Sequence, residues 1–156
     1  MCRKNRKCGF IDKEGNVVVP HIYNNAFSFS EGLACVEKNR KCGFIDKKGN
    51  VVVPLEYDDA YSFSEGLACV EINGKMGFIN KDGNVVIPLE YDWAGSFSEG
   101  LARVKKDGKF GFIDKEENVV VPLEYNEAHS FFEGLARVKK DGKRGFIDRT
   151  GSFIPD

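Results

Sequence analysis

The chain lacks several features that mark common classes of protein. Its longest apolar runs are Val17-Val18-Val19 and their later copies, far too short to cross a bilayer, and the N-terminus has no apolar secretion segment. Its 23 basic and 24 acidic residues nearly cancel, so charge favours neither nucleic acid nor an anionic membrane as a partner. We therefore expect no binding to nucleic acid or membrane, and a cytoplasmic location.

Cysteine is scarce and unevenly placed. The five cysteines, an odd number, lie at positions 2, 8, 35, 42 and 69, and none follows. A disulfide framework is normally even and spread through the fold, so we expect reduced thiols. Cys35 and Cys42 would be diagonal neighbours on a sheet, where a zinc-binding thiolate pair is conceivable, but their spacing matches no common zinc motif. We expect small buried residues instead, with no metal and no cofactor.

What the chain has in abundance is repetition. Gly-Phe-Ile-Asp/Asn recurs every 34 residues, and residues 9–42 and 43–76 agree at 25 of 34 positions. A fixed period of this length indicates a repeat architecture. Because almost nothing is specialised to one place, we find no candidate catalytic residues and expect no enzyme. The repeated glycines, here called the refrain glycines, are Gly9, Gly43, Gly77, Gly111 and Gly145.

Each unit begins with a pair of strands. In the fourth copy, residues 101–106 and 109–114 have the composition of strands and flank Asp107-Gly108. Asp-Gly favours a two-residue hairpin turn, since both turn positions need positive φ. Two earlier copies keep Asn but have Arg in place of Gly, so their turns should be costlier or differently shaped.

The hairpin register and the next turn predict the rest of the unit. Val104 falls opposite Gly111, and a glycine inside a strand predicts that something bulky rests over it. A turn with a left-handed glycine follows, where Glu117 replaces the glycine in this copy and should be strained or turn another way. Residues 119–122 then read as a third strand that ends at its proline.

The connectors between units carry recurring apolar residues and no helical periodicity. We expect these residues to fill the gaps between neighbouring sheets, because a lone three-stranded unit buries too little to be stable. They are Tyr23, Tyr57, Tyr91 and Tyr125, then Ala26, Ala60, Ala94 and Ala128, and Phe29, Phe63, Phe97 and Phe131.

These motifs resemble the WG (KWG) repeats of bacterial proteins. The resemblance rests on Lys-X-Gly-Phe-Ile-Asp, the Gly-Asn turn, Val-Val-X-Pro and Phe-Ser-Glu-Gly-Leu-Ala, and covers essentially the whole chain. It implies a β-repeat module, and the family has no established enzymatic activity that could be transferred to this chain. The tryptophan that gives the family its name is replaced by Cys8, Cys42, Met76, Phe110 and Arg144.

We predict an all-β fold: a single repeat domain over residues 1–156, made of five three-stranded antiparallel meanders in an open, twisted, solenoid-like array. The alternative is a closed five-bladed, propeller-like ring; the open array is favoured because no spare strand remains to close it. The chain starts inside a strand, so it is either part of a longer array or stacks its ends on other copies. The units span approximately 1–22, 33–56, 67–90, 101–124 and 135–156.

The function best supported by these patterns is a non-enzymatic scaffold for protein–protein interaction or self-association. Alternatives are a structural or accessory segment of a larger repeat protein, and a small-ligand-binding propeller-like domain. Trp93, the only tryptophan, is a candidate binding hot spot. The lysines of two hairpins complete the candidate interaction surface: Lys105, Lys109, Lys139 and Lys143.

Overall fold

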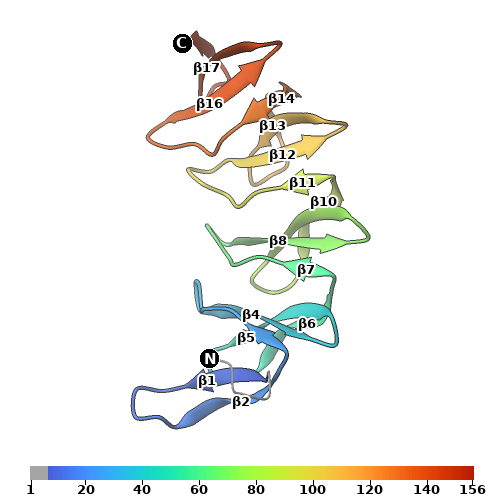
Figure 1. The fold of residues 1–156 in the computed structure, drawn as a ribbon, viewed down its shortest axis with the longest axis vertical. Coiled ribbons are helices and arrows are strands. Elements are labelled where there is room, and N and C mark those ends of the chain that lie inside the picture. Colours follow the sequence, from blue (N-terminus) through green and yellow to red (C-terminus); the bar gives the residue numbers. More distant parts are fainter. Residues whose placement is uncertain (1–6) are drawn as a thin grey trace.

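The computed structural model of the protein describes residues 7–156 and shows five small antiparallel sheets stacked along one axis (Figure 1). The described residues run from the first sheet at one end of the stack to the fifth at the other, and no strand of residues 7–156 pairs the first sheet with the fifth. The open all-β array is therefore confirmed, and the alternative of a closed ring is wrong. The predicted first strand of the first unit lies outside the described residues. Within residues 7–156, no helix has the length and apolar character needed to cross a membrane.

The strands fall into one pair and four sets of four. The first sheet holds β1 (Cys8–Ile11) and β2 (Val17–Tyr23). The second holds β3 (Asn25–Ala26), β4 (Leu33–Lys38), β5 (Lys41–Asp46) and β6 (Val51–Tyr57). The third holds β7 (Asp59–Ala60), β8 (Leu67–Ile72), β9 (Lys75–Asn80) and β10 (Val85–Tyr91). The fourth holds β11 (Trp93–Ala94), β12 (Ala102–Lys106), β13 (Lys109–Ile113) and β14 (Val119–Tyr125). The fifth holds β15 (Glu127–Ala128), β16 (Leu135–Lys140), β17 (Lys143–Asp148) and β18 (Phe153–Pro155).

A fourth strand in each of the second to fifth sheets corrects the prediction of three-stranded units. The connector adds a two-residue strand beside the first long strand, as where Ala60 lies opposite Val70. Two residues are too short to give a strand pattern in the sequence. They pair because the connector must pass the open edge of the sheet, where β8 offers unpaired backbone groups.

The hairpin turns have the predicted conformation. Asp107 and Gly108 both have positive φ, 51° and 79°, and Val104 pairs with Gly111 as expected. The Asn39-Arg40 turn has the same shape, with φ of 54° and 65°. A non-glycine residue in this region costs about 1 kcal/mol. The Asn39-Arg40 turn is thus costlier, not differently shaped; the Asn5-Arg6 turn lies outside the described residues.

A β-bulge in the third strand explains the refrain glycines of the first four sheets. Cys42 pairs with Tyr57 and Phe44 with Val53, so three residues of β6 oppose Gly43 alone. A Cβ on Gly43 would lie 2.4 Å from the carbonyl oxygen of Val53. The group resting over the glycine is therefore backbone, not a bulky side chain. Gly145 of the fifth sheet differs, because the Phe153 ring also approaches it.

The same bulge corrects the predicted end of the third strand. β6 continues through Pro54 to Tyr57, because the bulge leaves the proline without a ladder hydrogen bond to donate. The strand thereby gains a second paired segment. That segment carries Tyr57 into the core, where it is buried.

The core lies between neighbouring sheets rather than within one. Phe63 of the connector packs edge-on against Phe44 of the preceding sheet, with ring centroids 4.8 Å apart. The cluster around them continues into Ala68 and Ile79 of the next sheet. The connector tyrosine, alanine and phenylalanine thus fill the gaps as predicted, and are buried at all three junctions from the second sheet to the fifth.

Hydrogen bonds between connectors hold the sheets in register. The Ser64 hydroxyl donates to the carbonyl of Phe97, and the Glu65 carboxylate accepts from the Gly100 amide at 2.9 Å. Equivalent bonds recur one unit earlier and one unit later. In the last connector Phe132 replaces the serine and is 75% exposed. Every described junction from the second sheet onward is therefore built alike.

Candidate functional site

The two-residue strands lie at the edge of the second to fifth sheets, and the first long strand of each sheet from the second to the fourth donates a side-chain hydrogen bond to the two-residue strand of the next. We call this row of strands the connector edge. Each presents one residue paired across the ladder with a residue of the first long strand. These edge pairs are Asn25 with Glu37, Asp59 with Glu71, Trp93 with Lys105, and Glu127 with Lys139. Because the edge pairs occupy equivalent positions, their differences along the array show directly where one unit departs from another.

Three of the five predicted surface residues belong to these edge pairs. Trp93 and Lys105 pair with each other, and Lys139 occupies the equivalent place one sheet further on. Lys109 stands opposite Lys106, and alternation along β13 puts it on the other face of the hairpin from Phe110. Lys143 lies near the tip of the last hairpin. The structure thus does not gather the five into one patch.

Trp93 lies at the centre of a compact cluster in the fourth sheet. The Arg103 guanidinium carbon is 4.6 Å from the indole centroid, and the Phe110 ring lies edge-on to the indole, with centroids 6.2 Å apart and ring planes at 72°. The Lys105 ammonium lies 5.1 Å from the Phe110 centroid. Both cations therefore interact with an aromatic ring, an arrangement that contributes about 0.5–2 kcal/mol depending on exposure. All four side chains are partly exposed.

Gly95 makes room for the indole. A Cβ on Gly95 would lie 2.9 Å from the Cη2 atom of Trp93. The third sheet has the reverse arrangement, with Asp59 at the tryptophan position and Tyr61 at the glycine position, joined by a 3.2 Å hydrogen bond from the tyrosine hydroxyl. The aromatic side chain of this pair is therefore Trp93 in the fourth sheet, two residues before the position that Tyr61 occupies in the third. In both sheets the two positions thus hold one aromatic ring and one smaller residue.

Arg103 occupies a position that is a cysteine in the two preceding units. Its Nη1 donates to the carbonyl of Ala128, just as the thiols of Cys35 and Cys69 donate to those of Ala60 and Ala94 at 3.6 Å. Burial lowers the pKa of Arg103, and its Nε has no hydrogen-bond partner within residues 7–156. The guanidinium thus replaces the thiol at some cost in desolvation.

Two hollows flank the Trp93–Arg103 stack. One, of about 530 Å³, is bounded by the stack together with Asp92, Lys105 and Phe110. The other, also about 530 Å³, opens beside Gly95 and is lined by Tyr61, Cys69 and several serine residues. Both are open to solvent along the connector edge. A side chain from a partner could thus contact the stack from either side.

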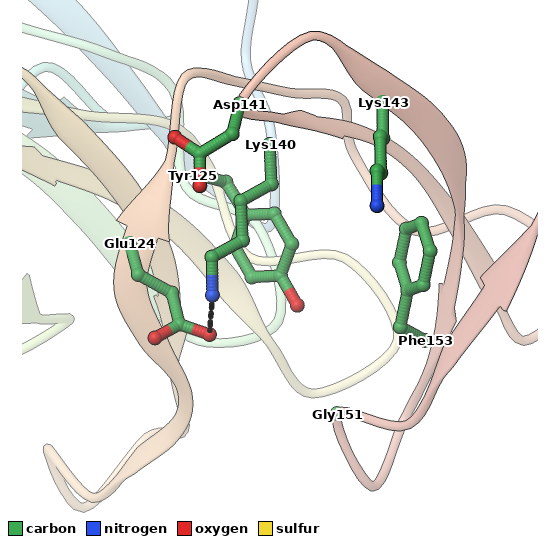
Figure 2. A pocket seen from close by; sticks show the side chains of 7 residues that line it. All are labelled: Glu124, Tyr125, Lys140, Asp141, Lys143, Gly151 and Phe153. Carbon is green, nitrogen blue, oxygen red and sulfur yellow. Dashed lines mark ion pairs between the residues drawn. The ribbon is translucent and has the colours of Figure 1, made fainter.

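Lys143 lines a separate groove between the fourth and fifth sheets (Figure 2). There Lys140 forms a 2.9 Å ion pair with Glu124 and lies 5.8 Å from the Tyr125 ring centroid, while Phe153 forms the opposite wall. An equivalent groove occurs beside Tyr23, between the first and second sheets, so this feature belongs to the repeat. It does not distinguish one unit from another.

The cysteines do not form a metal site in the described part of the chain. Cys35 and Cys42 are free and buried, and burial, followed by nearby charged groups, raises their pKa values to about 12 and about 11. Between residues 7 and 156, no group of three His, Cys, Asp or Glu side chains could hold a metal ion. Cys8 is disulfide-bonded, so the expectation of reduced thiols is wrong there and correct at Cys35, Cys42 and Cys69.

Charge reverses its sign along the connector edge, which the sequence analysis missed. Each edge pair and two further side chains on the same sheet face form a group of four, here called an edge quartet. The two further residues are Cys35 and Cys42 in the second sheet, Cys69 and Met76 in the third, Arg103 and Phe110 in the fourth, and Arg137 and Arg144 in the fifth. The formal charge of the quartet is -1 in the second sheet, from Glu37, and -2 in the third, from Asp59 and Glu71. It is +2 in the fourth sheet, from Arg103 and Lys105. It is also +2 in the fifth, where Glu127 offsets one of the three positive charges of Arg137, Lys139 and Arg144. Comparing equivalent positions down the repeats would have found it; comparing the two halves of the chain, where charge balances, could not.

The fold and the edge together define a class: an open β-repeat array whose stacked sheets present equivalent surface positions. The chain belongs to the WG containing repeat family, whose sequence model matches residues 9–42, 43–75, 76–110 and 110–143. The resemblance predicted from the motifs is thereby confirmed.

Other comparisons add little. No curated protein matches the chain. Among solved structures, a plant lectin with two metal binding sites from Cicer arietinum is 14% identical, the match covering 86% of this chain and 90% of the lectin, with a TM-score of 0.35. A 2S albumin seed protein from Dolichos is 12% identical over 86% of this chain and 92% of the albumin, with a TM-score of 0.33. Such low scores support no statement about this chain.

Proposed function

We propose that the protein is a non-enzymatic scaffold that binds protein, either a separate partner or a second copy of itself, through its connector edge. The supporting observation is the contact cluster of the fourth sheet, where the indole of Trp93 lies over Gly95 and contacts Arg103 and Phe110. Partly exposed tryptophan and arginine beside open hollows are the residue types that dominate binding energy at protein interfaces. The family and the fold supply the scaffold; the binding itself is the proposal.

The repeat architecture favours binding over catalysis. Junctions built alike place chemically similar groups at regular intervals, and such spacing suits an extended or multivalent contact. Catalysis instead needs unlike groups that converge on one point. The connector edge offers a row of separate charged and aromatic groups, and this is the form expected of a docking surface.

Site-specific cross-linking tests this function. A photoreactive residue in place of Lys105 should give one discrete adduct with a protein, including a second copy of this chain, identified by mass spectrometry after irradiation in a lysate. The same residue in place of Lys47, exposed in the turn after β5, is the control. Identical adducts from both positions, or none from position 105, would contradict binding through the connector edge.

Trp93 supplies an independent measurement because it is the only tryptophan. Its fluorescence should become less accessible to acrylamide once the purified partner, or a raised concentration of the chain itself, occupies the edge. Unchanged quenching at saturating partner would place the contact elsewhere on the molecule.

A further inference from the structure

We propose that two copies of this chain associate side by side and antiparallel through their connector edges, with the two-fold axis between the third and fourth sheets. This inference rests on the proposed function and deepens it by naming the occupant of the edge. Its basis is the sign reversal of the edge quartets, from -1 and -2 in the second and third sheets to +2 and +2 in the fourth and fifth.

The geometry of the repeat makes the antiparallel arrangement self-complementary. In that arrangement the third sheet of one copy faces the fourth of the other, and the second faces the fifth. Each contact then joins an acidic quartet to a basic one. Because both copies have the same spacing between sheets, all four contacts come into register together. A parallel arrangement without offset would instead place acid against acid.

Unfavourable contacts within one chain support a partner on this edge. Asp59 stands directly opposite Glu71, and Lys139 directly opposite Arg144. Like charges in such cross-strand pairs destabilise a sheet. Among the ion pairs of residues 7–156, none includes Glu37, Asp59 or Glu71, and none includes Arg103 or Lys105. In the fifth sheet Lys139 pairs with Glu127 of its own quartet at 3.5 Å, so Arg137 and Arg144 are the charges of that quartet left outside any described ion pair. The charges of a second copy would compensate both signs.

The edge also has apolar groups and sufficient length. Phe27 and Tyr61, on the acidic half, are 48% and 44% exposed. Sheets stack about 10 Å apart, so four sheets give an edge of about 40 Å. Over that length, a contact about 20 Å wide would reach the roughly 800 Å² that each partner contributes to an interface of standard size.

Charge-swap variants test the arrangement, with light scattering after size-exclusion chromatography at low ionic strength as the measurement. The unchanged chain should have twice the mass of one copy and should dissociate in 1 M salt, where charges are screened within about 3 Å. The acid-to-base variant, Glu37→Lys with Glu71→Lys, should be monomeric. The base-to-acid variant, Lys105→Glu with Lys139→Glu, should be monomeric too.

Recombining the charges separates a lost interface from a lost fold. An equimolar mixture of the two variants should form a mixed dimer, because the unchanged basic quartets of one variant face the unchanged acidic quartets of the other. A chain with all four changes has quartet charges of +1, 0, 0 and 0 and should stay monomeric. Circular dichroism checks that each variant is folded. Lys47→Glu with Lys48→Glu, two exposed residues of the turn after β5, changes the net charge as much as the base-to-acid variant and should leave the dimer intact.

The outcomes distinguish this inference from the proposed function. An unchanged chain that is monomeric at low salt and high concentration, or a folded acid-to-base variant that stays dimeric, would overturn the antiparallel dimer. Growth into open-ended assemblies would overturn it as well, because that result indicates a parallel, offset association. In each of these cases a partner cross-linked from position 105 would still support a binding scaffold.

Discussion

The junction between the second and third sheets and the junction between the fourth and fifth are built alike but filled differently. In both, a connector phenylalanine packs edge-on against the preceding sheet at 4.8 Å, and a side chain donates to the connector alanine carbonyl. That donor is the thiol of Cys35 at one junction and the guanidinium of Arg103 at the other. The comparison indicates that the fold requires a hydrogen-bond donor at this position, whereas the size and charge of the donating side chain can vary.

The variation is not random, because it is concentrated where the junctions reach solvent. Buried positions such as Val36, Val70, Val104 and Val138 keep the same residue in all four units. The edge quartets change in charge, size and aromatic content together. We infer that stacking constrains the interior equally in every unit, whereas the connector edge is where units differ in surface chemistry.

Removal of the connector phenylalanine should show the largest effect and should be equal at the two junctions. Phe63→Ala and Phe131→Ala each delete a buried ring at a sheet–sheet interface, and such changes cost about 3–5 kcal/mol. Urea denaturation of each variant measures the loss. A loss at one junction more than twice that at the other would break the equivalence of the two regions.

The refrain glycines should come next. In Gly43→Ala and Gly111→Ala, the new Cβ would lie 2.4–2.5 Å from a backbone carbonyl oxygen, which cannot move without disrupting the bulge. We expect a loss of about 3 kcal/mol for each, the upper part of the usual range for overpacking. The control is Gly66→Ala, which has positive φ but open space around it and should lose only about 1 kcal/mol. Equal losses at all three positions would exclude the bulge as the cause.

The sequence predicted the features that depend on local patterns. The period, the Asp107-Gly108 hairpin and its register, and the connector residues that fill the junctions are all confirmed, because turn chemistry and alternation act over a few residues. The bulge and the two-residue strands were missed. The continuation of β6 beyond Pro54 depends on a pairing that no local pattern shows, and β7 exists only because a sheet edge lies beside it.

The candidate site was predicted in part. Trp93 was singled out as the only tryptophan, and Lys105 proves to be its cross-strand partner. Arg103 and Gly95 were missed because each is unremarkable alone, and their roles follow from contact with the indole ring. Lys109 and Lys143 were included on charge alone. Alternation along β13 places Lys109 away from Trp93, and Lys143 belongs to the fifth sheet and lines a separate groove.

Grafting the third sheet's residues onto the fourth tests whether the cluster is one coupled unit. Arg103→Cys alone should lose about 2 kcal/mol, because it removes the cation over Trp93 and leaves a gap. Adding Trp93→Asp, Gly95→Tyr and Phe110→Met recreates the set found in the third sheet. The combined loss should then be smaller than the sum of the four single losses by about 1–2 kcal/mol. Urea denaturation of the single and combined variants measures this coupling; strict additivity would show that the residues act independently.

The smallest effect is expected at Glu117, where the fourth unit departs from the others in a turn. Its φ is 69°, at a position held by glycine in the other described units. Glu117→Gly should therefore stabilise the chain by about 1 kcal/mol. Glu117→Gln keeps the strained backbone and removes only the charge, so thermal unfolding of the two variants separates conformational strain from electrostatics.

The pH dependence of the glutamine variant gives the decisive result. Burial, followed by the nearby Glu90 carboxylate, raises the pKa of Glu117, so its ionised form disfavours the folded state. At neutral pH the glutamine variant should thus be slightly more stable than the unchanged chain. As pH falls through the pKa of Glu117, the carboxyl group takes up a proton in the folded state and this advantage should disappear. The glycine variant should retain most of its gain at acidic pH, because backbone strain does not titrate. If both gains vanish together on acidification, the turn is destabilised by charge alone, and the left-handed glutamate costs no more than the glycines it replaces.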